Sequence, residues 1–292
     1  MTSILIGPAP AGPRPPRPVV FYPSQLSLFL ECPQRYYLKY GLRRPVEAGF
    51  SPSLAKGIAV HATLAEVAEG LRLGRPVPGE AVLRSIATSH LPHGPYPSEI
   101  SWHSDVAIVL AQAQYALAGL APDARVVAVE QTYSYAYPGG SGCPPFTLRC
   151  RADLVTAQDG LNTTTLTEDA ALTVTDWKSG GRPNRLQTVI ALIVAHHAYP
   201  HAAAIHSATV FLATRRAQVE HLGRDDVAAT WRLIKRTVAA ILVEREWRPN
   251  PSALCEWCPY ETNGCALAPV ARPDEADDED APPDATTRWL EG

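Results

Sequence analysis

Arg151-Ala152-Asp153 and, further along the chain, Asp176-Trp177-Lys178 decide the fold of this sequence. The first triplet lies in 148–155, where apolar and polar residues alternate, which predicts a strand. Successive side chains point to opposite faces of a strand, so Asp176 and Lys178 are expected on the same side of a second one. Pairing of these two strands would bring both carboxylates to one point.

Two carboxylates and a lysine in this arrangement can form a metal-dependent site that cleaves phosphodiester bonds. Their hard oxygen ligands suit Mg²⁺ or Mn²⁺. The ion would polarise the phosphate and lower the pKa of a bound water, while Lys178 would hold the nucleophile or neutralise developing charge. The competing interpretation is an ordinary Asp-x-Lys tripeptide on the solvated edge of a strand.

Length and composition describe a large globular chain. Its 292 residues, 46% of them hydrophobic, suffice for one large domain or for one domain with an attached subdomain. No apolar run approaches the roughly 20 residues that span a bilayer. Residues 1–20 lack the basic start and long apolar centre of a secretion signal, so we expect a cytoplasmic protein without membrane contact. The six cysteines would then be reduced, which favours metal or cluster binding over disulfides.

The formal net charge of −3 combines two parts of opposite sign. Residues 271–292 contain eight acidic residues and two arginines, which leaves 24 basic and 21 acidic residues in the rest of the chain. This body is compatible with nucleic-acid binding, but it lacks the strong basic bias of a purely electrostatic binder.

Helix and strand signals lie between two segments that we expect to be disordered. Residues 1–23 are rich in proline and residues 269–292 in acidic side chains. Helices are predicted from Ser24 onward and at 54–73, 100–120, 184–199 and 225–247, and strands at 125–137, 146–156, 172–178 and 204–214. This order predicts an α/β fold: a helical N-terminal part (24–120) precedes a core (125–247) in which a mostly antiparallel sheet receives a β-α-β crossover.

Three cysteines cluster near the C-terminus. Cys255, Cys258 and Cys265 have the spacing C-x₂-C-x₆-C, which leaves a tetrahedral metal or a four-iron cluster one ligand short. The best candidate for the fourth ligand is Cys32, so binding would join the two ends of the chain. Zinc is the competing occupant, although zinc ribbons usually supply two C-x₂-C pairs, and free or buried cysteines are a third interpretation. The remaining two, Cys143 and Cys150, are interpreted as packing residues.

Five motifs together resemble a known family. They are Ser24-Gln25-Leu26-Ser27 with Cys32-Pro33-Gln34-Arg35-Tyr36-Tyr37, Gly57-Ile58-Ala59-Val60-His61, Arg151-Ala152-Asp153, Thr175-Asp176-Trp177-Lys178-Ser179-Gly180, and the segment from Cys255 to Cys265. In this order they resemble the PD-(D/E)xK nuclease superfamily, and within it the RecB-like exonucleases that carry a four-iron cluster. That group includes the CRISPR-associated RecB-like exonucleases, their phage relatives and the nuclease domain of AddB. The resemblance covers 24–268 and implies a restriction-endonuclease-like mixed sheet flanked by helices, with a C-terminal iron–sulfur segment at 255–265.

The resemblance also implies roles for individual residues. His61, Asp153 and Asp176 would ligate Mg²⁺ or Mn²⁺, aided by the backbone carbonyl of Trp177, and Lys178 would orient or activate the attacking water. The four cysteines of the cluster, Cys32, Cys255, Cys258 and Cys265, would hold a [4Fe–4S] cluster that stabilises the fold. Without this context, His61 would be interpreted as an ordinary, partly buried histidine.

Three positions depart from the family pattern or extend it. The family follows its catalytic strand with Gln-x₃-Tyr on a helix, and here Gln187 is present while the tyrosine position holds Ala191. Tyr199 is no substitute, because it points about a third of a turn away on the helix. The glycine expected before the first aspartate is Cys150. Glu130 is a further acidic residue, which we expect to point to solvent.

The sequence therefore predicts a DNA exonuclease or end-processing nuclease that cleaves single-stranded DNA by metal-activated water. Candidate phosphate contacts are Arg35, Arg149, Arg151, Arg182 and Arg185. Two alternatives are a non-catalytic DNA-binding partner in recombination or repair and a zinc-stabilised module. The resemblance is compatible with a helicase or integrase-type protein partner, with a homo-oligomer, and with a CRISPR, phage or repair context.

Overall fold

The computed structural model describes residues 19–46, 51–121, 123–140, 142–158, 171–180, 184–220, 224–260 and 265. The expected acidic tail, Arg182 and most of the proline-rich start lie outside these residues. The chain divides into two compact units, one formed by Met1–Leu30 and Ala48–Glu244, the other by Glu31–Glu47 and Arg245–Gly292.

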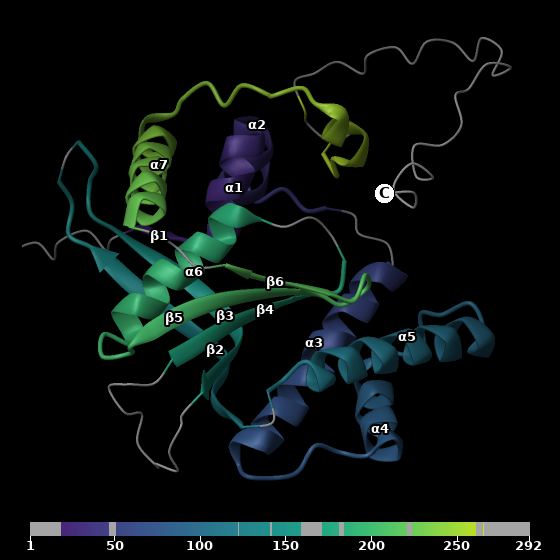
Figure 1. The fold of residues 1–292 in the computed structure, drawn as a ribbon. Helices are drawn as coiled ribbons and strands as arrows, with labels where there is room; N and C mark the ends of the chain where they lie inside the picture. The colour runs from purple at the N-terminus through teal and green to yellow at the C-terminus, as the bar shows by residue number, and fades with distance from the viewer. Residues whose placement is uncertain are drawn as a thin grey trace, which may run out of the picture. The chain divides into compact units, whose positions relative to one another are not determined.

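A six-stranded mixed sheet forms the centre of the first unit (Figure 1). Its strands are β1 (Val19–Phe21), β2 (Ala124–Tyr137), β3 (Phe146–Gln158), β4 (Ala171–Lys178), β5 (Ala204–Phe211) and β6 (Arg216–Glu220). Neighbours pair in the order β1-β3-β4-β5-β6, and β2 pairs with β3. The pairs β1–β3 and β4–β5 are parallel, whereas the other pairs are antiparallel. The predicted mixed α/β fold with its crossover, here β4–α6–β5, is confirmed.

One edge of β3 is shared between two strands. β1 pairs with its residues 146–148, and β4 pairs with its residues 154–158. Along the described chain, no strand pairs with residues 149–153 on that edge, while β2 follows the opposite edge of β3 almost throughout. The sheet is therefore open in the middle of the strand that carries Asp153.

Helices cover both faces of this sheet (Figure 1). On one face lie α3 (Pro52–Arg72), α4 (Glu80–His90) and α5 (Glu99–Ala118), whose apolar side chains share a core with Leu154, Trp177 and Leu212. On the other face, α6 (Arg185–Ala198) packs on Val155 and Val174, and α7 (Arg224–Val243) contacts α6. The burial of these apolar faces holds the crossover helix α6 against the sheet.

Three elements differ from the sequence-based expectation. β1 lies at the end of the segment expected to be disordered, because Phe21 is buried edge-on against Phe146 and its neighbours are β-branched valines. α4 was not predicted. The strand expected at 204–214 ends at Phe211 and turns back into β6, with Arg215 in a left-handed conformation (φ 52°).

The second unit brings together two segments that are distant in sequence. After α1 (Pro23–Glu31) the chain forms α2 (Pro33–Tyr36) and a π-helix, η1 (Tyr37–Gly41), and its C-terminal segment contributes the 3-10 helix η2 (Ala253–Trp257). Trp247 stacks on Tyr36 and Tyr37 with ring centroids 5.9 and 4.8 Å away. These ring contacts, together with the buried Tyr260, hold the two segments in one core.

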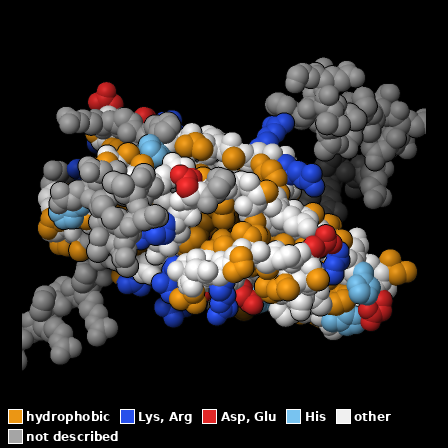
Figure 2. Space-filling model, turned by 60° about the horizontal axis from the view of Figure 1, so that its bottom comes forward, with side chains coloured by type: hydrophobic (Ala, Val, Ile, Leu, Met, Phe, Trp, Pro, Cys, Tyr) orange, Lys and Arg blue, Asp and Glu red, His pale blue; other side chains and the backbone are white. Residues whose placement is uncertain are grey.

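Surface charge does not mark a binding track on the face shown in Figure 2. Among the residues drawn in colour, hydrophobic side chains gather in the middle of this view, and Lys and Arg side chains lie in separate groups rather than in a continuous band. This agrees with the modest basic excess of the body.

Candidate active site

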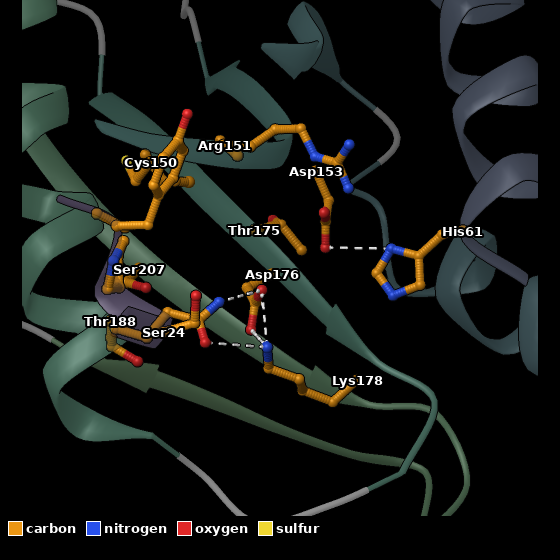
Figure 3. A pocket seen from close by; sticks show the side chains of 16 residues that line it. Ser24, His61, Cys150, Arg151, Asp153, Thr175, Asp176, Lys178, Thr188 and Ser207 are labelled. Atoms are coloured by element: carbon orange, nitrogen blue, oxygen red, sulfur yellow. Dashed lines mark hydrogen bonds and ion pairs between the residues drawn. The ribbon is translucent and has the colours of Figure 1, made fainter. Parts of the chain in front are cut away.

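Asp153 and Asp176 lie opposite each other on β3 and β4. The antiparallel register pairs Leu154 with Thr175, and one step further it places Asp153 across from Asp176. Asp153 is buried, and its Oδ2 atom accepts a 2.8 Å hydrogen bond from the backbone N–H of Trp177. The predicted pairing of the two strands therefore brings the carboxylates together, as Figure 3 shows.

Lys178 is held by Asp176 and Gln187 (Figure 3). Its Nζ atom donates to the two oxygens of Asp176 at 3.1 and 2.8 Å and to Oε1 of Gln187 at 3.3 Å. Gln187 donates from Nε2 to Asp176 Oδ1 at 3.1 Å, which closes a triangle of polar groups. The side chain of Asn184 caps α6 by accepting from the N–H of Gln187, so the helix start positions this amide.

Burial raises the pKa of the Asp176 carboxyl above its usual value, although the neighbouring Lys178 ammonium acts in the opposite direction. The carboxylate form therefore depends on its partners. Bonds from Lys178 and Gln187 supply the stabilisation that water gives an exposed carboxylate.

His61 reaches the site from α3, whose N-terminus is capped by Ser51. Its Nδ1 atom is 3.5 Å from Asp153 Oδ2, and this buried nitrogen has no hydrogen-bond partner among the described residues. Burial would lower the pKa of His61, but contact with Asp153 and the charges of Glu130 and Asp176 outweigh burial and raise it. A buried, unsatisfied imidazole nitrogen beside a carboxylate is a feature of a metal-ligand site.

Glu130 corrects one expectation, because its carboxylate points into the site and not to solvent. It is opposite Asp153 on β2, between the pairs Val129–Leu154 and Gln131–Ala152, and its backbone is left-handed (φ 49°). This conformation interrupts the alternation of side chains along the strand, which explains why a simple pattern fails at this residue. Burial and the charge of Asp153 raise the pKa of Glu130, while a 2.8 Å ion pair with Arg151 opposes them.

The geometry around His61 fits a divalent cation. Ligand atoms of His61, Glu130 and Asp153 all lie within 4.8 Å of one another. Two carboxylates and an imidazole suit Mn²⁺ and Mg²⁺. Both oxygens of Asp176, which is outside this group of three, contact Lys178, and its expected role as a metal ligand stays a prediction. Trp177 donates its backbone N–H to Asp153, and its side chain is buried against α3, α4 and α5.

A pocket of about 270 Å³ extends from these charged groups. Besides the residues above, it is lined by Tyr22, Pro23, Ser24, Cys150, Arg151, Ala152, Val174, Thr175, Thr188, Ala191 and Ser207. Ala191, at the position of the family's tyrosine, therefore borders open space. Tyr199 is instead hydrogen-bonded to the hydroxyl of Tyr133 at 2.6 Å.

The candidate phosphate-binding arginines differ in their partners. Arg35, Arg151 and Arg185 are ion-paired with acidic residues: Glu31, Glu130 and Asp226 respectively. Arg149 instead contacts the hydroxyls of Tyr22 and Ser134, both at 3.3 Å. Among the four of these arginines that the structure describes, Arg149 is the side chain whose positive charge is least compensated by these contacts.

All four cysteines of the predicted cluster lie in the second unit. They are free thiols; Cys32 accepts from the N–H of Arg35, Cys255 accepts from the N–H of Ser252, and Cys265 lies 3.2 Å from the side-chain oxygen of Gln34. Asn250 links the two segments by donating to the carbonyl of Glu31. Within the described part of the chain, three or more potential ligands meet within 4.8 Å at His61, Glu130 and Asp153 alone, so the thiols share a unit without being gathered to that spacing.

Cys143 and Cys150 are buried, in agreement with packing roles. Burial raises the pKa of the Cys150 thiol to about 12, so it is uncharged at neutral pH. Its neutral, compact side chain forms part of the pocket wall.

Comparisons with known proteins identify the family of this chain. A family model described as the PD-(D/E)XK nuclease superfamily matches residues 21–263. The solved structure of SSO0001 is similar over 86% of this chain and 85% of its own, at 14% identity and a TM-score of 0.36, which is too low to carry an argument. No curated protein matches. Within the described residues, none of the helices is long and apolar enough to cross a membrane.

Proposed function

Because this chain belongs to the PD-(D/E)XK nuclease superfamily, we propose that it is a Mg²⁺- or Mn²⁺-dependent DNA exonuclease or end-processing nuclease that acts on single-stranded DNA. Superfamily membership makes it a nuclease that hydrolyses phosphodiester bonds. One observation supports the proposed cleavage of DNA most directly: His61, Asp153, Asp176 and Lys178 all line the same pocket.

His61, Glu130 and Asp153 would hold the metal ion in this proposal. When bound, the ion supplies a polarised phosphate and a water of lowered pKa. The Nδ1 atom of His61 lacks a hydrogen bond in the described structure and is free to be a ligand. The N–H of Trp177 orients the Asp153 carboxylate, as partners of metal ligands commonly do.

Lys178 would place a positive charge beside the phosphate that is cut. Its ammonium has three donor positions, and both Asp176 and Gln187 accept from it. The ammonium is thereby fixed in the pocket, where it can hold the attacking water or stabilise the charge that develops on the phosphate oxygens. Gln187 acts through this lysine and through Asp176.

Cys32, Cys255, Cys258 and Cys265 would hold a [4Fe–4S] cluster in the second unit. Supporting this proposal, the fold brings four thiols from both ends of the chain into one unit, and backbone N–H groups donate to two of the sulfurs. Such hydrogen bonds stabilise thiolates. Visible absorbance of an anaerobic preparation tests it, because Zn²⁺ lacks iron–sulfur charge transfer; a colourless protein with stoichiometric zinc would favour the zinc-stabilised alternative.

Cleavage of labelled single-stranded DNA tests the nuclease proposal. Wild-type protein with Mn²⁺ should degrade a linear strand but leave a circular one intact, because an exonuclease requires an end. Asp176→Asn should slow the reaction about 100-fold or more, since it frees Lys178 from its carboxylate partner. Asp225→Asn, an exposed residue of α7, is the matched control.

Three results would contradict the proposal in whole or in part. Degradation that persists in Asp176→Asn would point to a contaminating nuclease. Binding of DNA without metal-dependent cleavage by the wild type would favour the non-catalytic DNA-binding alternative. Cleavage of the circular strand would retain the nuclease but remove the exonuclease.

A further inference from the structure

The pocket has a charged end and a neutral end. His61, Asp153, Asp176 and Lys178 lie at one end, whereas Cys150, Thr188 and Ser207 lie at the other (Figure 3). The neutral end forms where the edge of β3 is unpaired between β1 and β4. The gap in strand pairing thus creates a cavity directly beside the groups that would cut the phosphate.

Small side chains make this end of the pocket deep. Cys150, Ala152, Val174 and Ser207 are each at most 4% exposed, and Ala191 from α6 forms the wall across from the sheet. A larger side chain at position 191 would project into the space that these residues leave. Residue size on both sides therefore keeps this part of the pocket, whose whole volume is about 270 Å³, open.

Hydroxyl groups line the neutral end without adding charge. Ser24, Thr188 and Ser207 each have a hydroxyl, although that of Thr188 also donates to the carbonyl of Asn184, and Tyr22 adds an aromatic ring to the lining. Hydroxyls and an aromatic ring suit the edge and face of a nucleobase. A phosphate would instead be drawn to Lys178 at the charged end, since an anion without a cationic partner is poorly tolerated in a buried site.

We propose that this cavity binds the base and sugar of the unpaired nucleotide next to the phosphate that is cut, and that Ala191 is the residue that makes room for it. The inference rests on the proposed nuclease function. It requires a nucleotide outside a base-paired stack, because a stacked base cannot enter a side pocket without being flipped out. Single-stranded substrate is then selected by shape rather than by charge.

Binding measurements in Ca²⁺, under conditions where no cleavage occurs, test this without relying on activity. The probes are a ten-nucleotide thymidine strand and an abasic strand of equal length and charge. Wild-type protein should prefer the strand with bases, and Ala191→Tyr should reduce the ratio of the two affinities about tenfold, the scale of one base contact. His196→Tyr adds the same bulk to an exposed position of α6 and should keep the wild-type ratio.

Equal affinity of the wild type for the two strands would overturn the proposal, and so would an unchanged ratio in Ala191→Tyr. Ala191→Leu fills less space and provides the same comparison if the tyrosine variant does not fold, as judged by its thermal transition. Failure of the nuclease proposal is seen separately, as absence of Mn²⁺-dependent cleavage. Equal affinity of the wild type for the two strands, with its Mn²⁺-dependent cleavage intact, would refute the cavity alone.

Discussion

Replacement of Gly57 by alanine tests whether the approach of α3 to the end of β4 sets the rate of cleavage. A Cβ atom at position 57 would lie 2.9 Å from Oγ of Ser179, whereas ordinary contacts begin near 3.4 Å. Either α3 or Ser179 must therefore move by about 0.5 Å. His61 lies one turn further along α3, where its Nδ1 atom is 3.5 Å from Asp153 Oδ2.

The expected cost in rate follows from that displacement. A misplacement of about 1 Å can cost about 100-fold in rate, so a shift of α3 by half of that should slow cleavage by up to about tenfold. Stability should not fall in parallel, because alanine favours a helix over glycine by about 0.5–1 kcal/mol. Gly57→Ala should therefore be at least as stable as the wild type yet slower, a combination that partial unfolding does not produce.

Cleavage of single-stranded DNA in Mn²⁺ and thermal unfolding measure the two effects. Ser179→Ala removes the Oγ atom that a new Cβ would meet, so the double variant Gly57→Ala/Ser179→Ala should regain most of the rate. A wild-type rate in Gly57→Ala would show that Ser179 simply rotates away. A double variant that stays slow would refute the contact as the cause.

Three further changes test other parts of the structure. Glu130→Gln removes a carboxylate from the candidate metal group and should move the Mn²⁺ dependence of cleavage to about tenfold higher concentration; an unchanged titration would exclude this ligand. Tyr96→Phe removes a 2.9 Å hydrogen bond to the buried carboxylate of Asp105 and should lower the free energy of unfolding at pH 7 by about 2 kcal/mol. Burial and this bond raise the pKa of Tyr96 from 10.0 to about 12, so Tyr96 loses its proton at lower pH in the unfolded chain than in the folded one. The difference in free energy of unfolding between the wild type and Tyr96→Phe should therefore shrink as the pH rises from 10.0 to about 12. Urea titrations in which this difference stays constant over that range would contradict the prediction. Cys258→Ser should remove the visible absorbance of an anaerobic preparation, whereas Cys143→Ala should retain it.

The parts of the fold that the sequence predicts are those with a long, regular pattern. β3 and β4 show clear alternation, and α6 begins at Asn184, a side chain that caps helices well. β1 has three residues and follows a proline-rich segment, so its strand character depends on pairing with β3. The helix expected to reach residue 247 ends at Val243, and Trp247 adopts φ 49° where it stacks on Tyr36 and Tyr37. Tertiary contacts decide these elements.

The candidate site likewise contains residues that local sequence patterns predict and residues that depend on tertiary contacts. Local spacing was enough to place Lys178 beside Asp176 and to bring Gln187 to the start of α6. The orientation of Glu130 requires a left-handed residue inside a strand, and no local pattern indicates one. A register count across the β2–β3 hairpin would have put it opposite Asp153, and that is the signal that could have found it. The neutral end of the pocket is lined by residues of β3, β4, β5 and α6 together, so no single sequence motif predicts it.

The candidate site lies where the pairing and backbone of the sheet are irregular. The left-handed residue of β2, the unpaired edge of β3 and the buried carboxylate of Asp153 all occur at one level of the sheet. A left-handed non-glycine residue costs about 1–3 kcal/mol, and regular pairing on both sides of Glu130 must offset that cost. Regular pairing through this level would remove both the inward turn of Glu130 and the space behind Asp176. The interruption of the sheet is therefore what allows charged groups and a pocket of about 270 Å³ to occupy its interior.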